Sequence, residues 1–255
     1  MKNEHTARQK APAGRYALLD ELRGLDLVSM MLYHACWDLM FLFDVNMRWY
    51  AGTPGRLWQQ SICWVFILLS GFCVPLGRHT LRRGTVVFGA GAVVTLATLV
   101  FMPEGRVIFG VLTFLGTAML LTGVLEPVLK RIPPLVGLAA SAVLFVLCSP
   151  VSSGRVGIGS WQVLLPQSLD ANYFTALFGF YPDWFYSADY FGLLPWLFLF
   201  WAGYYLHKAV GRRRMELLRH SVCPSLGWMG RHSLLLYLLH QPVIYGVLSA
   251  AALFS

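Results

Sequence analysis

The first apolar stretch of the chain, residues 19–40, reads L-D-E-L-R-G-L-D-L-V-S-M-M-L-Y-H-A-C-W-D-L-M. Its leucines, methionines and valine predict a membrane-spanning helix near residues 24–43. The same stretch contains Asp26, His34 and Asp38, and a charged group at the centre of a spanning helix costs about 2.5–3.5 kcal/mol. We therefore expect these three side chains to face the interior of a helical bundle or a wet cavity.

The composition of the whole chain supports a membrane protein. Of its 255 residues, 57% are hydrophobic and 13% are charged, whereas soluble domains carry about 25% charged residues. The mean hydropathy is +0.59. The net charge of +8 could indicate nucleic-acid binding. However, the basic residues lie in short clusters between apolar runs, which is typical of membrane topology, so we predict no nucleic-acid partner.

A spanning helix needs about 20 apolar residues, and the sequence predicts seven such spans in an all-α bundle. They lie near 24–43, 57–76, 84–102, 107–126, 135–150, 190–208 and 229–252. With the amino terminus inside and the carboxyl terminus outside, most basic residues fall on the inner side. The short fifth span is retained because the Arg212–Arg214 cluster would otherwise lie outside. We expect a multi-pass protein of the bacterial inner membrane, anchored by its uncleaved first span.

Two further predictions concern the organisation of the chain. Residues 1–14 are polar and are expected to form a disordered basic tail, and residues 15–255 a single transmembrane domain. The longest connection, 151–189, is expected on the outer side, where a loop of this length is rarely a mere connector. Its many aromatic residues suit either a segment lying in the membrane interface or a lid over an outward-facing site for a sugar or another polyol.

The polar groups of the first span share one helical face. At 100° per residue, Arg23, Asp26, His34 and Asp38 lie within one sector. His34 lies about 16 Å along the axis from Arg23, roughly half the hydrocarbon thickness. The series could be a structural hydrogen-bonded network, or a site in which a neutral His34 acts as general base. In that site Asp38, one turn away, could fix the tautomer of His34.

The last span has a second polar face. Residues 226–246 read L-G-W-M-G-R-H-S-L-L-L-Y-L-L-H-Q-P-V-I-Y-G, and Ser233, Tyr237, His240 and Gln241 fall within about 100° of one another. Pro242 leaves one backbone carbonyl without its helical partner. The span is either an ordinary kinked packing helix or a second wall of the same site, with Tyr237, His240 and Gln241 binding substrate.

The chain resembles bacterial members of the heparan-alpha-glucosaminide N-acetyltransferase catalytic-domain family. The opening stretch from Leu19 is similar to the start of that family, and three other segments agree with it over essentially residues 15–250. These segments are F-G-V-L-T-F-L-G at 109–116, A-D-Y-F-G-L-L-P-W-L at 188–197 and G-R-H-S-L-L-L-Y-L-L-H-Q-P at 230–242. The spacing from Arg23 to His34 also resembles the R-x10-H pattern of a broader group of membrane acyltransferases.

This resemblance implies an enzyme that moves an acetyl or other short acyl group from a cytoplasmic acyl-CoA to a sugar or amino-sugar acceptor across the membrane. Arg23 and Asp26 would then belong to substrate binding, with Arg23 near the phosphates of the donor, because guanidinium binds phosphate bidentately. His34 and Asp38 would be catalytic, and no metal is implied.

Two alternatives stay open at the level of the sequence. One is a proton-coupled small-molecule transporter, because a buried His and Asp series also suits a proton relay. The other is a non-catalytic membrane protein that binds a partner. The oligomeric state is open as well, with a homo-oligomer among the options.

Overall fold

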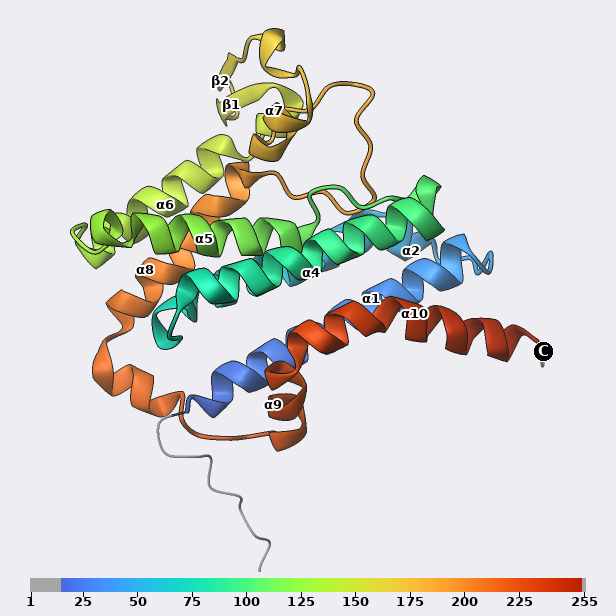
Figure 1. Ribbon diagram of the computed structural model, residues 1–255, viewed down its shortest axis with the longest axis horizontal. Helices are drawn as coiled ribbons and strands as arrows, with labels where there is room; N and C mark the ends of the chain where they lie inside the picture. The colour runs from blue at the N-terminus through green and yellow to red at the C-terminus, as the bar shows by residue number, and fades with distance from the viewer. Residues whose placement is uncertain (1–14, 254–255) are drawn as a thin grey trace, which may run out of the picture. The chain divides into compact units, whose positions relative to one another are not determined.

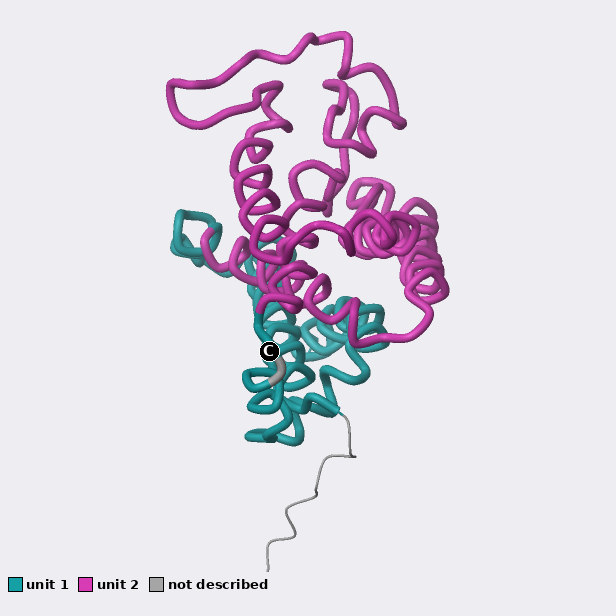
Figure 2. The backbone as a smooth tube through the Cα atoms, turned by 90° about the vertical axis from the view of Figure 1, so that its left-hand side faces the viewer, with its two compact units in different colours: residues 1–56, 210–255 teal, residues 57–209 magenta. Residues whose placement is uncertain are grey.

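The computed structural model describes residues 15–253, so the tail predicted for residues 1–14 lies outside them. The described chain is mostly helical, with one two-stranded sheet, which confirms the all-α class. Its contacts group into two compact units, shown in Figure 2. Unit 1 combines residues 1–56 with 210–255, and unit 2 comprises residues 57–209. The prediction of a single domain over 15–255 stays a prediction.

Unit 1 is built on the first and last helices of the chain. Its helices are α1 (Ala17–Phe41), α2 (Arg48–Ala51), α9 (Pro224–Arg231) and α10 (Ser233–Ala252). The helix α1 contacts both α9 and α10, and Figure 1 shows α10 running beside it. The contact with α9 is close because it uses glycines. A Cβ at Gly24 would lie 2.0 Å from the carbonyl oxygen of Leu226, and one at Gly230 would lie 1.8 Å from that of Asp20.

The span predicted over 229–252 is divided in the structure. The helix α9 ends at Arg231, and α10 begins at Ser233. His232 lies between them and closes α9, because its backbone N–H bonds to the carbonyls of Trp228 and Met229. The ring of His232 also stacks on that of Trp228, with centroids 4.6 Å apart. The polar pair Arg231–His232 therefore ends one helix instead of lying inside a longer one.

Unit 2 contains most of the apolar helices. They are α3 (Thr53–Phe72), which begins in unit 1, α4 (Thr80–Phe101), α5 (Val111–Leu129), α6 (Pro134–Cys148) and α8 (Leu193–Leu217), which ends in unit 1. The helices α4 and α5 pack side by side (Figure 1). The indole N–H of Trp201 on α8 donates to the hydroxyl of Thr122 on α5 over 3.0 Å. The hydroxyl of Tyr205 donates to the Leu129 carbonyl over 3.3 Å. These two bonds tie α8 to α5.

Two of the family-like segments meet at the start of α5. The carboxylate of Asp189 accepts a hydrogen bond from the backbone N–H of Val111 over 3.1 Å. The hydroxyl of Ser187 accepts from the N–H of Ile108 over 2.9 Å. Helix amino termini expose N–H groups that need such partners. The acidic segment before α8 therefore caps α5, which begins within the F-G-V-L-T-F-L-G segment.

The connection 151–189 contains regular structure that the sequence did not predict. It holds β1 (Arg155–Ile158), β2 (Trp161–Leu164), α7 (Tyr173–Phe178) and short 3-10 turns at 151–153 and 167–169. Two further 3-10 turns lie at 74–76 and 103–105. The two strands pair antiparallel, with Val156 opposite Val163 and Ile158 opposite Trp161. The aromatic residues after α7 pack on one another around Phe185, whose ring lies 5.1 Å from that of Tyr190.

Helices cover all seven predicted spans, including the short fifth one. Among the residues that the structure describes, five segments are long and apolar enough to cross a membrane, namely Thr53–Leu76, Thr80–Phe101, Val111–Leu129, Pro134–Ser153 and Ser233–Ala252. The other two helices, α1 and α8, have 25 residues each, which is enough length to span. They carry more polar residues, such as Asp26, His34 and Asp38 on α1. The protein is therefore an integral membrane protein, and its seven-span topology and orientation stay predictions.

Candidate functional site

Two polar helical faces meet within unit 1. His34 on α1 and His240 on α10 lie with their ring centroids 4.8 Å apart and their planes tilted by 60°. One turn further along α1, the carboxylate oxygen Oδ1 of Asp38 accepts a hydrogen bond of 2.7 Å from the side-chain amide Nε2 of Gln241. The structure thus brings together four of the residues that the sequence selected from two distant segments.

The hydrogen-bond partner of Asp38 lies on another helix. The sequence left open whether Asp38 contacts His34 or another residue, and in the structure its carboxylate accepts a hydrogen bond from Gln241 on α10. Asp38 is fully buried, at 0% exposure. A buried carboxylate needs compensating hydrogen bonds because its desolvation is costly. The Asp38–Gln241 pair therefore links α1 to α10, and the group that lies against the His34 ring is His240.

The orientation of His240 is set by its own helix. Its Nδ1 lies 2.5 Å from the backbone carbonyl oxygen of Tyr237, one turn earlier. A carbonyl oxygen can only accept, so in the neutral ring Nδ1 carries the hydrogen and Nε2 carries the lone pair. That Nε2 is buried and has no hydrogen-bond partner among the described residues. His240 is thus held as a proton acceptor.

Other acceptor atoms nearby are also unsatisfied. Within the described part of the chain, neither Asp38 Oδ2 nor Gln241 Oε1 has a hydrogen-bond partner, and both atoms are buried. Buried polar atoms in native proteins are nearly always hydrogen-bonded, and exceptions call for an explanation. Three acceptors on three side chains, those of Asp38, His240 and Gln241, are thus left for a ligand with donor groups or for water.

Aromatic rings flank the two histidines. The ring of Tyr237 lies 5.3 Å from that of His240, and the ring of Tyr33 lies 6.0 Å from that of His34. Tyr50 on α2, which is buried, donates its hydroxyl to the Tyr33 carbonyl over 3.1 Å. Sequence reasoning missed Tyr50, because an isolated tyrosine in a loop between two spans carries no periodic signal. It anchors α2 against the segment that presents His34.

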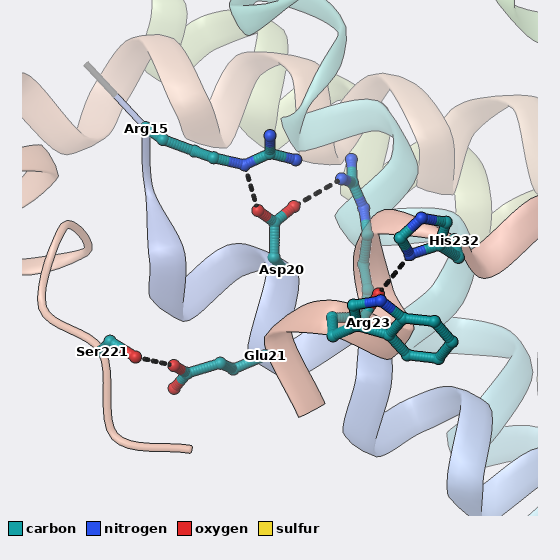
Figure 3. A network of polar contacts seen from close by, with 7 residues as sticks. Arg15, Asp20, Glu21, Arg23, Ser221 and His232 are labelled. Atoms are coloured by element: carbon teal, nitrogen blue, oxygen red, sulfur yellow. Dashed lines mark hydrogen bonds and ion pairs between the residues drawn. The ribbon is translucent and has the colours of Figure 1, made fainter. Parts of the chain in front are cut away.

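At the other end of α1, Arg23 takes part in an ion-pair cluster (Figure 3). Its Nη1 lies 3.6 Å from Oδ1 of Asp20, and Arg15 Nε lies 2.6 Å from Oδ2 of the same carboxylate. Two guanidinium groups thus share one carboxylate, so the cluster keeps a net positive charge. The side chain of Arg23 is 22% exposed.

Glu21 belongs to a second contact at the same end (Figure 3). Its carboxylate accepts hydrogen bonds from the hydroxyl of Ser221 and from the backbone N–H of Val222, the latter over 2.9 Å. Burial alone would raise the pKa of Glu21, but these hydrogen bonds outweigh it and hold the pKa below its ordinary value. Glu21 therefore fixes the segment before α9 to the start of α1.

Asp26 lies between the two ends. It is buried, and its Oδ2 has no hydrogen-bond partner among the residues with described coordinates. Arg23, Asp26, His34 and Asp38 all lie on the single helix α1, as the sequence predicts. The structure places His34, Asp38, Tyr237, His240 and Gln241 in one cluster, while Arg23 pairs with Asp20 at the helix start.

Comparison with known proteins identifies the family of the chain. No curated protein matches the chain, and no solved structure does. A sequence profile of the family described as heparan-alpha-glucosaminide N-acetyltransferase, catalytic, matches residues 15–242. This range includes α1, α9 and the half of α10 that carries His240 and Gln241. Membership of that family indicates a membrane acetyltransferase. The chain belongs to the heparan-alpha-glucosaminide N-acetyltransferase catalytic family.

Proposed function

We propose that the protein transfers an acetyl or other short acyl group from acyl-CoA to a sugar or amino-sugar acceptor, with His34 as the general base. The observation that carries this proposal is the contact between the rings of His34 and His240, which lie 4.8 Å apart. Family membership supports the reaction class. The buried acceptors of Asp38 and Gln241 support an acceptor rich in hydroxyl or amino groups.

In the proposed reaction, a ring nitrogen of His34 takes the proton from the acceptor hydroxyl or amine as its oxygen or nitrogen attacks the thioester carbonyl. The new C–O or C–N bond forms, the C–S bond breaks, and the thiolate leaves. His34 then returns the proton to the thiolate sulfur, so the base is regenerated. Arg23, with the net positive cluster around Asp20, would hold the phosphates of the donor.

His240 has a positioning role in this scheme. Its lone pair at Nε2 is directed by the bond from Nδ1 to the Tyr237 carbonyl. The half-buried His34 is more accessible than His240, which is 7% exposed. We therefore propose that His34, and not His240, contacts the reacting atoms. His240 lies against it and favours the His34 tautomer and ring orientation that the proton transfer needs, the part that a carboxylate plays in other acyl-transfer sites.

The test is transfer from labelled acetyl-CoA to a panel of amino sugars by the purified protein, with products identified by mass spectrometry. We expect His34→Ala to lower kcat by about 10²–10⁴-fold, the usual contribution of a general base. His240→Phe keeps a ring against His34 but lacks the acceptor nitrogen. It should lower kcat and alter its pH profile while leaving KM for acetyl-CoA unchanged.

The matched control for both variants is His79→Asn. His79 is exposed in unit 2 and has a left-handed backbone with φ of 58°, which asparagine tolerates. This variant should keep full activity. Full activity of His34→Ala would refute the assignment of the base. Full activity of His240→Phe with an unaltered pH profile would refute only the role of His240.

A proton-coupled transporter is the second candidate, because two histidines in contact inside a bundle also suit a proton relay. Proteoliposomes separate the two functions. Uptake of a solute driven by a pH gradient without any acyl donor would favour transport. Product that forms only when acetyl-CoA is present would favour the transferase.

A further inference from the structure

The hairpin β1–β2 has one entirely apolar face. In an antiparallel pair, residues directly opposite each other point to the same side of the sheet, and so do residues two apart along a strand. The register Val156↔Val163 and Ile158↔Trp161 therefore places these four side chains on one face. The opposite face carries Arg155, Gly157, Gln162 and Leu164.

Within residues 15–253, most of the apolar face is uncovered, with Val156 partly buried and the other three side chains exposed. The exposed fractions are 54% for Ile158, 88% for Trp161 and 70% for Val163. A two-stranded hairpin is marginally stable in water without a surface to pack against. Three large apolar side chains side by side in water would make it less favourable still. The face therefore requires an apolar environment that lies outside the described chain.

The neighbouring helix α6 indicates that this apolar environment is the lipid bilayer. The segment Pro134–Ser153 is apolar enough to cross a membrane, and β1 begins two residues after it. The strand β1 contacts α6 directly. Much of α6 is itself exposed and apolar, with Leu135 at 72% and Val143 at 56%. The hairpin therefore starts where the spanning segment leaves the hydrocarbon, at the depth of the lipid headgroups.

We propose that the hairpin Arg155–Leu164 lies in the headgroup region beside α6, with the face Val156, Ile158, Trp161 and Val163 turned into the lipid. Tryptophan favours this region, because its ring is apolar and its N–H can still reach water or headgroups. Gln162 and Arg155 on the opposite face remain in water. The hairpin thus acts as an interfacial anchor, which fixes the start of the 151–189 connection to the bilayer surface.

The test uses the unaltered protein in vesicles of phosphatidylethanolamine and phosphatidylglycerol that contain a phospholipid with a photoactivatable diazirine near its glycerol backbone. After illumination, adducts are located by mass spectrometry of proteolytic fragments. We expect adducts on Trp161 and Val163 in several-fold excess over Gln162, which lies between them on the same strand. Tyr181 and Tyr190, which lie against each other in the aromatic cluster after α7 with centroids 5.1 Å apart, should be labelled far less than Trp161.

A second measurement uses photo-cross-linking from the variant Trp161→p-benzoylphenylalanine. The control is Gln162→p-benzoylphenylalanine. Cross-links from position 161 to phospholipid would support the anchor. Cross-links to a second copy would assign the face to self-association, and cross-links within the chain would assign it to a lid. Either of these results, or equal lipid labelling at 161 and 162, overturns the proposal. None of them affects the acyltransferase assignment, which rests on unit 1.

Discussion

Asp38 is the most deeply buried carboxylate of the candidate site, and its one side-chain hydrogen bond comes from Gln241. Removing that donor leaves a buried acceptor without a partner, which costs about 1–3 kcal/mol. We predict that Gln241→Leu lowers the free energy of unfolding by about this amount, measured by denaturation in detergent.

The matched comparison for this prediction is the double variant Asp38→Leu with Gln241→Leu. Because it removes both partners, the penalty of an unpaired buried group disappears, and the double variant should be more stable than Gln241→Leu alone. If the two substitutions instead lower stability additively, the side chains are not coupled and the hydrogen bond does not link α1 to α10.

Glu21 gives the protein a pH-dependent contact. Its folded pKa lies below its ordinary value of 4.5 because Ser221 and Val222 donate to the carboxylate. A carboxyl with a lowered folded pKa stabilises the fold above the unfolded pKa, and that stability is lost as the pH falls through the folded pKa. We predict that Glu21→Gln lowers Tm at neutral pH and reduces the further loss of Tm below pH 4.5.

Glu216→Gln is the control for this experiment. Glu216 pairs with Arg219 over 2.8 Å, but its side chain is 63% exposed, and exposed pairs contribute little. Its Tm should follow that of the unaltered protein at every pH. Identical acid sensitivity of Glu21→Gln and the unaltered protein would show that Glu21 does not hold the segment before α9.

At the scale of residues, the sequence predicts which side chains share a helical face, but not which side chains on another helix they contact. The helical wheel places His34 and Asp38 on one face of α1, and His240 and Gln241 on one face of α10. It cannot say which turn of one helix lies against which turn of the other, because that depends on the crossing point. The sequence could therefore offer His34 only as one possible partner of Asp38, and the structure pairs Asp38 with Gln241.

Among the elements, the crossing of α1 and α9 depends on small residues. A Cβ at Gly24 would lie 2.0 Å from the carbonyl oxygen of Leu226, closer than any real contact. We predict that Gly24→Val forces the two helices apart and destabilises the protein by about 1–3 kcal/mol or more, the usual cost of overpacking. Thermal unfolding in detergent measures this loss.

The control substitution is Gly89→Ala on α4. A Cβ at Gly89 would meet no atom within 4 Å, and alanine favours a helix over glycine by about 0.5–1 kcal/mol. This variant should be as stable as the unaltered protein or slightly more stable. Equal stability of Gly24→Val and Gly89→Ala would contradict the close crossing of α1 and α9.

The long apolar helices could be predicted, but two smaller elements could not. Hydrophobic runs of span length locate α3 to α6 because only a helix satisfies the backbone in lipid. The end of α9 at Arg231 depends instead on His232, whose backbone N–H closes the helix. The hydrophobic pattern alone was compatible with a longer helix that included His232. The four-residue strands β1 and β2 are too short for periodicity to separate them from a loop.

For the molecule as a whole, composition alone was sufficient to predict the class. A chain with 57% hydrophobic and 13% charged residues cannot bury its apolar surface in a soluble fold of this size. The distribution of arginines and lysines adds an orientation, which stays a prediction. The grouping of contacts into two units could not be predicted, because it depends on pairings between segments about 200 residues apart, such as Asp38 with Gln241.

Unit 1 joins residues 1–56 to residues 210–255, and the paired histidines come one from each segment. The ribosome makes α1 long before α10. A growing chain therefore carries His34 through most of its synthesis without the helix that places His240 against it, and without the Gln241 amide that bonds to Asp38. The two halves of the candidate site can close only when translation is nearly finished, so an incomplete chain cannot assemble it.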